Sequence, residues 1–144
     1  MTQEIDRITF ELTVRAVHSG PDDVWMQGDL HVLINGHPPY SINDMVDPAA
    51  LLRSLAAEGR YFLFSCTCGA PECGGWEQGI AVSHRDQLTE WKDIDKETSW
   101  RFKQQDIAEG LREVQTEVDF FKSFFRVKNI RFYAPDLEDR GSAT

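Results

Sequence analysis

All three cysteines of the chain lie in one short stretch, Cys66-Thr67-Cys68-Gly69-Ala70-Pro71-Glu72-Cys73. Cysteine thiolates are strong zinc ligands, and a structural zinc ion takes four ligands in tetrahedral geometry. A bound metal also supplies free energy to a loop that buries little apolar surface. The pattern therefore predicts a structural zinc site at Cys66, Cys68 and Cys73. The alternative is that these thiols are small packed side chains without a metal, or that two of them pair by oxidation.

The fourth zinc ligand is less clearly marked than the first three. His84 would complete a set of three cysteines and one histidine, which zinc favours. In a simple hairpin, however, His84 lies opposite Phe62, about 13 Å from Cys66 at the rise of a β-strand. Three other residues are therefore kept as alternatives to His84, namely Glu72, His31 and His37.

The same thiols allow two other functions. A cysteine next to His84 would act as a nucleophile if the imidazole activated its thiolate. No oxyanion donor or oriented base can be named beside these cysteines, so we expect no enzymatic turnover from them. Accessible thiols of low pKa would instead suit a redox or metal-sensing protein, in which they alternate between metal-bound and oxidised states.

The cysteines need elements that hold them in place. Residues 61–64 and residues 79–82 are short apolar runs, each typical of a buried strand. The cysteine segment 66–76 is therefore expected to be the long loop of a hairpin. Further strands are expected at Leu88 to Trp91 and around Trp100 to Phe102.

The N-terminal part carries the clearest strand pattern. Apolar and polar side chains alternate from Ile8 to Ala16, which is typical of a strand with one buried face. A second strand is expected from 24 to 34, and it ends at Asn35-Gly36, a pair that favours a tight hairpin turn. The last strand is expected between Val127 and Tyr133.

Two helices are expected between these strands. Asp47 can cap the first helix and Pro48 suits its first position. Its buried stripe is predicted to be Leu51, Leu52, Leu55 and Ala56. The longer helix is expected from 106 to 123, because apolar side chains recur there at helical spacing, at Ile107, Leu111, Val114, Val118 and Phe121.

Together these elements predict an α+β fold with a mainly antiparallel sheet and two helices packed on one of its faces. Residues 1–134 are expected to form a single domain, and residues 135–144, which are polar, a flexible tail. At 144 residues the chain is long enough to bury a sizeable core.

The net charge bears on which partners are expected, and the N-terminal sequence bears on where the protein is expected to be located. The 24 acidic and 15 basic residues give a net charge of −9, which disfavours direct binding to nucleic-acid phosphates. No secretory signal or membrane span is expected from the sequence, so we expect a cytoplasmic protein with reduced thiols.

Glu109, Glu113 and Glu117 recur at steps of four along the longer helix, off its apolar stripe. This spacing places the three carboxylates in one row on one side of the helix. The row predicts a surface that binds a basic protein partner, whereas the simpler alternative is a solvated helix face.

The central segment resembles a group of small uncharacterised bacterial proteins. The likeness lies in Gly59 to Gly69, with Phe64-Ser65-Cys66-Thr67-Cys68, then in Pro71 to Gly75 and Gly79 to His84. Proteins of this group resemble immunity or accessory proteins of bacterial conflict systems. The resemblance therefore implies a non-enzymatic binding protein of a bacterium, with a basic toxin or effector as its partner.

Overall fold

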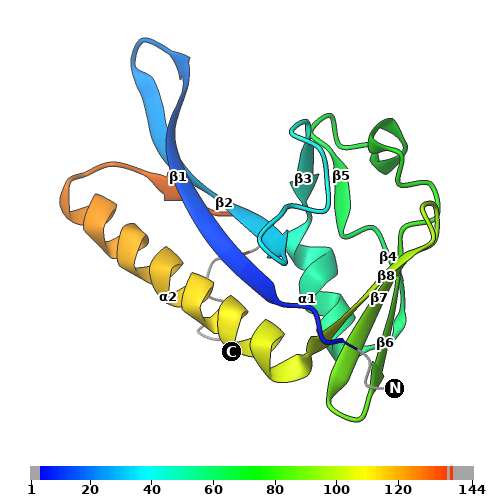
Figure 1. Ribbon diagram of the computed structural model, residues 1–144. Helices are drawn as coiled ribbons and strands as arrows, with labels where there is room; N and C mark the ends of the chain where they lie inside the picture. Colours follow the sequence, from blue (N-terminus) through cyan, green and yellow to red (C-terminus); the bar gives the residue numbers. More distant parts are fainter. Residues whose placement is uncertain (1–3, 136, 138–144) are drawn as a thin grey trace.

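The computed structural model describes residues 4–135 and residue 137, and it confirms an α+β fold with mainly antiparallel strands (Figure 1). The strands form three sheets rather than the single sheet expected. A long ribbon and its helix occupy one side of the molecule, and a four-stranded sheet occupies the other. Within the described residues, no helix is both long enough and apolar enough to span a membrane.

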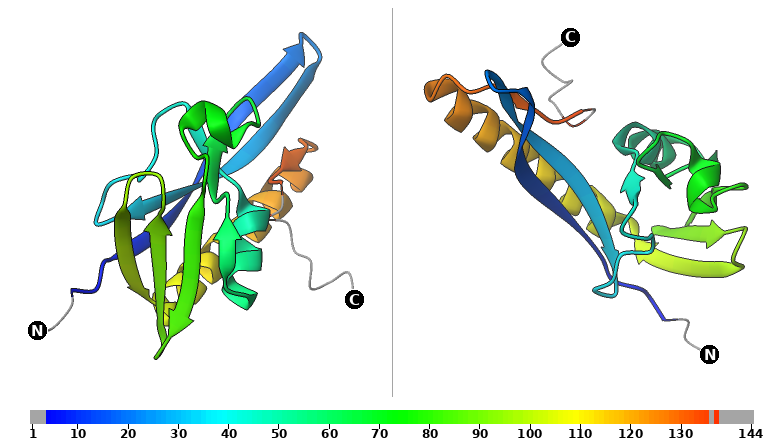
Figure 2. Two further views of the ribbon diagram at one scale, coloured as in Figure 1. Left: turned by 90° about the vertical axis from the view of Figure 1, so that its right-hand side faces the viewer. Right: turned by 90° about the horizontal axis from the view of Figure 1, so that it is seen from above.

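The ribbon consists of β1 (Ile8–Gly20) and β2 (Asp23–Ile34), and β1 is longer than the alternation at 8–16 predicts. The two strands pair antiparallel, from Ile8 opposite Ile34 to His18 opposite Val24. More buried side chains alternate with more exposed ones from Ile8 to Arg15 of β1 and from Gly28 to Ile34 of β2, as period-2 patterning requires. The far end of the ribbon projects away from the rest of the molecule (Figure 2).

The longer helix, α2 (Gln104–Val127), packs against β1 and extends beyond the predicted range at both ends. Ile107, Val114 and Val118 are buried, as the sequence predicts. A Cβ at Gly110 would lie 2.5 Å from Cδ2 of Phe10, so glycine at this position permits the close approach of helix and strand.

The chain after α2 differs from the prediction. Val127 belongs to the helix and is exposed, and only β9 (Phe132–Tyr133) is a strand, pairing parallel with Met26 and Gln27 of β2. Of the predicted tail at 135–144, only residues 135 and 137 are among the described residues. Of these, Leu137 is buried in the core.

The four-stranded sheet has the order β4 (Gly59–Tyr61), β6 (Ile80–Arg85), β7 (Leu88–Asp93), β8 (Thr98–Lys103), and each neighbouring pair is antiparallel. The turn between β6 and β7 is formed by Asp86 and Gln87, whose φ angles are 52° and 68°. His84 and Arg85 are the last two residues of β6.

The predicted hairpin around the cysteines is correct only at its base. Tyr61 of β4 lies opposite Ile80, but the chain then leaves this sheet. β5 (Phe64–Cys66) pairs with β3 (Asp44–Val46) in a separate two-stranded sheet. The cysteine segment therefore connects two sheets, and it contains a short 3-10 helix, η1 (Pro71–Gly74).

The first helix, α1 (Pro48–Ala56), begins as predicted, with the Asp47 carboxylate accepting hydrogen bonds from the N–H groups of Ala49 and Ala50. Its predicted buried stripe is wrong at Leu52, Leu55 and Ala56, which are all exposed, and correct only at Leu51. The helix instead buries the side that carries Ala50, Leu51 and Ser54. Ser54 is tolerated there because its hydroxyl donates to the carbonyl of Leu51.

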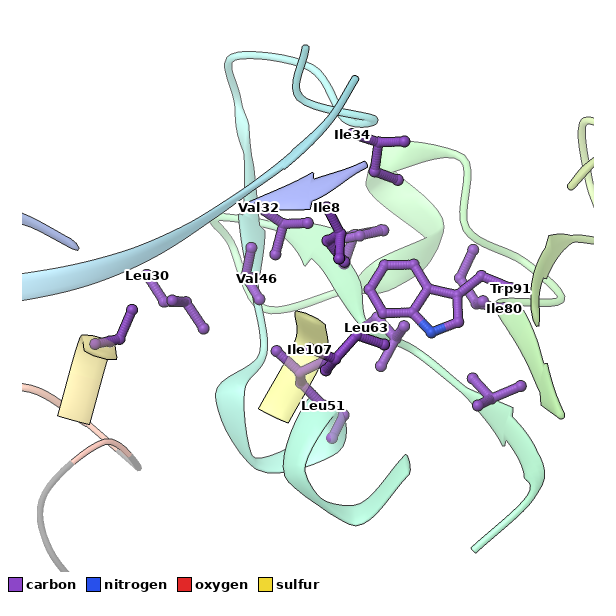
Figure 3. Close-up of a cluster of buried hydrophobic side chains, with 14 of the residues drawn as sticks. Ile8, Leu30, Val32, Ile34, Val46, Leu51, Leu63, Ile80, Trp91 and Ile107 are labelled. Carbon is purple, nitrogen blue, oxygen red and sulfur yellow. The ribbon is translucent and has the colours of Figure 1, made fainter. Parts of the chain in front are cut away.

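One cluster of buried side chains joins all of these parts. Figure 3 shows Val32 and Ile8 of the ribbon beside Leu63 and Trp91 of the other half. Aromatic rings extend the cluster toward the cysteines: Phe64 lies 5.2 Å from Trp76 and 6.2 Å from Trp91 between ring centroids. The cysteine loop therefore begins and ends on buried aromatic residues.

Candidate metal centre

Backbone hydrogen bonds fold the cysteine segment into a compact turn. The N–H of Gly69 donates to the carbonyl of Cys66 at 2.8 Å, and Gly69 has a φ of 97°, which favours glycine. The N–H of Cys73 donates to the carbonyl of Ala70 at the start of η1. These bonds turn the chain back on itself, so that Cys73 returns beside Cys66 and Cys68.

The three thiols converge as predicted. Their sulfur atoms all lie within 4.8 Å of one another. Three thiolates at about 2.3 Å from a tetrahedral zinc ion would be about 3.8 Å apart, so small side-chain movements would let all three bind one ion. Cys66 is half-buried, whereas Cys68 and Cys73 are exposed. The donor set therefore fits a soft metal ion such as zinc, reached from the solvent side.

The thiols also change one another's acidity. The pKa of the Cys68 thiol is lowered, chiefly because the backbone N–H of Ala70 donates to its sulfur, and also because Cys73 and Cys66 donate to it. The pKa of Cys73 is raised to about 11, because its proton is shared with Cys68 and because the negative charge of that neighbour opposes a second ionisation. Of these two thiols, Cys68 therefore loses its proton more easily than Cys73.

The structure does not bring His84 to the cysteines. Its Nδ1 lies 2.8 Å from the Thr89 hydroxyl and its Nε2 lies 2.8 Å from the Ser54 carbonyl, so both ring nitrogens already have partners. The register of β6 explains this position, because His84 lies at the end of the hairpin away from the loop.

The alternative ligands are not brought together with the thiols either. His31 lies on the ribbon, where its Nε2 contacts the Thr13 hydroxyl at 2.9 Å. No fourth histidine, cysteine or acidic residue of the described chain, Glu72 and His37 included, joins the group of three sulfur atoms. A metal held by these thiols would therefore have a fourth position open to water or to an external ligand.

Trp76 and Asp44 hold the cysteine loop in place. No role is predicted from the sequence for either residue. Trp76 is 1% exposed, and its indole Nε1 donates to the Asp44 carboxylate at 3.4 Å. A Cβ at Gly74 would lie 2.6 Å from Oδ1 of Asp44, so η1 packs closely on β3. The sequence carried one signal for this role, a large aromatic residue directly after a glycine pair.

The second predicted site is the row of carboxylates on α2. Glu109, Glu113 and Glu117 are all exposed, as expected for the outer side of the helix. Glu109 accepts a hydrogen bond from the Gln105 amide. Across the described residues, none of the three forms an ion pair within 4.0 Å.

Comparison of the chain with protein-family models, with curated proteins and with solved structures gave no match. The resemblance of the central segment to small bacterial proteins therefore stays a prediction.

Proposed function

We propose that the protein is a metal-binding protein in which Cys66, Cys68 and Cys73 hold one zinc ion with an open fourth position. The observation that carries this proposal is the convergence of three sulfur atoms within 4.8 Å. Packing alone does not account for this convergence, because Cys68 and Cys73 are exposed and bury little surface. Zinc favours thiolate ligands, and closed structural sites supply four protein ligands. A site with three ligands suits reversible binding of the metal.

The cysteine loop has no hydrophobic core of its own, which supports the proposal that a bound ion would stabilise it. None of the nine residues from 67 to 75 is buried. The loop is fixed at its ends by Phe64 and Trp76, and in between by turn hydrogen bonds. A bound ion would tie Cys73 of η1 to β5, and its binding free energy would add to the stability of the loop.

Metal content tests the proposal directly. Protein purified under reducing conditions and loaded with zinc is dialysed, and the bound metal is measured by native mass spectrometry. We expect about one zinc per chain, and none in a variant in which all three cysteines are replaced by serine. A matched variant, Thr67→Ala, changes an exposed residue of the same loop and should bind zinc normally. Less than about one-tenth equivalent in the unchanged protein would contradict the proposal.

A second function is proposed for the helix face: binding of a basic protein partner by Glu109, Glu113 and Glu117. The supporting observation is that these exposed carboxylates form no ion pair with the rest of the described chain. Complementary charges speed association and make it sensitive to salt. The resemblance to immunity proteins suggests the class of partner, a basic toxin or effector, so the chain would act without catalysis.

This second function is tested with the product of the neighbouring gene. Binding is measured at low and high salt, for the unchanged protein and for a variant in which Glu109, Glu113 and Glu117 are all replaced by lysine. We expect affinity to fall with salt and to be lost in the variant. Unchanged affinity of the variant would exclude this helix face, and the Thr67→Ala protein serves as the control.

A further inference from the structure

The outer edge of β1 has no partner in the described part of the chain. The sheet order is β1-β2-β9, so β1 pairs on one side only. The strand is 13 residues long, contains no proline, and keeps a regular register up to His18. Proteins usually block long edges with proline, bulges or short strands, because open edges pair with other strands. In Figure 1 no further strand of the described residues lies beside the edge of β1 away from β2, so the backbone groups of this edge are available to pair with another strand.

The hydrogen bonds next to the ribbon show which groups of β1 point to this edge. The N–H of Asn35 donates to the carbonyl of Arg7, so Arg7 faces the β2 side. On β2, the N–H groups of Ile34 and Met26 point away from β1, to His37 and Arg131. Backbone groups alternate in direction along an antiparallel pair. The outward N–H and C=O groups of β1 are therefore those of its even-numbered residues, Phe10, Leu12, Val14 and Ala16.

We propose that a second copy of this chain pairs with the edge, β1 against β1 in antiparallel orientation, with Thr13 of each copy on the two-fold axis. In this register Leu12 lies opposite Val14 of the second copy, and Phe10 lies opposite its Ala16. These are the residues whose backbone groups point outward. The pairing would exchange about eight hydrogen bonds, because each such pair of residues makes two. The two ribbons would then form one continuous antiparallel sheet.

The side chains of β1 are self-complementary in this register. On the solvent face, Glu11 lies opposite Arg15 of the second copy, and the two-fold axis repeats the pair. Opposite charges directly across a strand pair stabilise it, and like charges destabilise it. On the other face the central opposed side chains, Leu12 with Val14 and Phe10 with Ala16, are apolar, and Ile8 meets His18 at each end. Phe10, Leu12 and Val14 are only half-buried in the single chain.

Registers shifted by two residues lose this match. With Leu12 on the axis, Glu11 meets Thr13 and Arg15 meets Thr9. With Val14 on the axis, Glu11 meets Val17 and Arg15 meets Thr13. Arg15 already contacts Asp29 of its own ribbon at 2.8 Å. In the proposed register its guanidinium would lie between Asp29 and Glu11 of the second copy.

The primary test is the mass of the protein in solution, measured by sedimentation equilibrium at physiological salt, since a net charge of −9 on each copy opposes association at low salt. We expect a dimer that dissociates in the micromolar range. Glu11→Arg and Arg15→Glu should each weaken the dimer by about tenfold or more, because each places like charges opposite one another. An equimolar mixture of the two variants should restore it as a heterodimer, because opposite charges then meet again. Glu77→Arg makes the same charge change at an exposed residue before β6, away from β1, and should leave the dimer unchanged.

A second measurement does not depend on variants. Hydrogen exchange followed by NMR should show concentration-dependent protection of the Phe10, Leu12, Val14 and Ala16 amides, whereas those of Glu11 and Thr13 are protected at all concentrations by β2. Two results would overturn the proposal: a protein that stays monomeric up to about 0.5 mM, or a dimer that neither charge reversal affects and whose even-numbered amides exchange freely.

Discussion

The cysteine loop and the acidic face of α2 both present three residues of one chemical type, but they arrange them in opposite ways. On the loop, three thiols from β5, the turn after it and η1 come within 4.8 Å of one another. On the helix, Glu109, Glu113 and Glu117 point to solvent at one-turn intervals, and no ion pair joins them within the described chain.

This difference shows what a structure can add to a sequence pattern. Spacing along a helix places like charges near one another whether or not a ligand exists, and water screens their repulsion. Convergence of the thiols instead needs a folded turn. In this turn the pKa of Cys68 is lowered, chiefly by the backbone N–H of Ala70 and then by the other two thiols, and the pKa of Cys73 is raised by Cys68. Such mutual perturbation marks the loop as the stronger candidate for a binding site.

The largest expected effect is the loss of a ligand. Cys73→Ser should lower zinc affinity by at least about a thousandfold, because each thiolate contributes a substantial part of the binding free energy of a zinc site. Competition with a chelator of known affinity measures the change. The matched change on the other surface, Glu113→Ser, should leave zinc affinity unaltered. If the Cys73→Ser protein bound zinc as tightly as the unchanged protein, the cysteine loop would not be a zinc site and would not differ from the α2 face in this respect.

The second effect concerns the support beneath the loop. Trp76→Ala should lower the free energy of unfolding by about 3–5 kcal/mol, because it removes a fully buried aromatic side chain. Phe120→Ala on the outer side of α2 should cost less than about 1 kcal/mol, because Phe120 is 61% exposed. Urea denaturation measures both values. Equal costs would show that the loop is not anchored in the core.

The third effect is the pH dependence of metal binding. The pKa of Cys73 is about 11 in the metal-free cluster, so zinc must displace its proton near neutral pH. The apparent association constant should therefore rise with pH, by at least about tenfold per unit between pH 6 and pH 8. Calorimetric titration in buffers of different ionisation enthalpy counts the released protons. Binding that is independent of pH would contradict a thiolate site.

The smallest effect belongs to the acidic row. Glu113→Gln should raise the free energy of unfolding by a few tenths of a kcal/mol, because it relieves repulsion from the carboxylates one turn away on either side. The gain should shrink at high salt, since exposed charges are screened. Thermal unfolding at two salt concentrations measures it. A loss of stability would mean that Glu113 has an attractive partner.

The sequence predicted the parts of this fold that depend on local patterning. The alternation appears from Ile8 to Arg15, although Ala16 is exposed, and the stripe at Ile107, Val114 and Val118 is buried, because burial of one face follows directly from the period of the element. The cap at Asp47 is also present, since it needs only neighbouring backbone groups.

Strand pairings and side-chain contacts between residues distant in the sequence were not predictable in the same way. The sequence allows Phe64 to pair with the strand at 79–82, whereas in the structure it lies opposite Val46 of β3. The close spacing of the three cysteines predicts that they meet. A simple hairpin already makes His84 a doubtful fourth ligand, and its actual contacts with Ser54 and Thr89 depend on how α1 meets β6 and β7. Asp44 carried no sequence signal at all.

X-ray absorption at the zinc edge of the metal-loaded protein tests the central claim most directly, because it counts the atoms bound to the ion. An ion held by Cys66, Cys68 and Cys73 should show three sulfur atoms at about 2.3 Å and one oxygen or nitrogen atom at about 2.0–2.1 Å. A first shell of oxygen and nitrogen alone would show that the converging thiols do not bind zinc, and four sulfur atoms would show that the fourth position is not open.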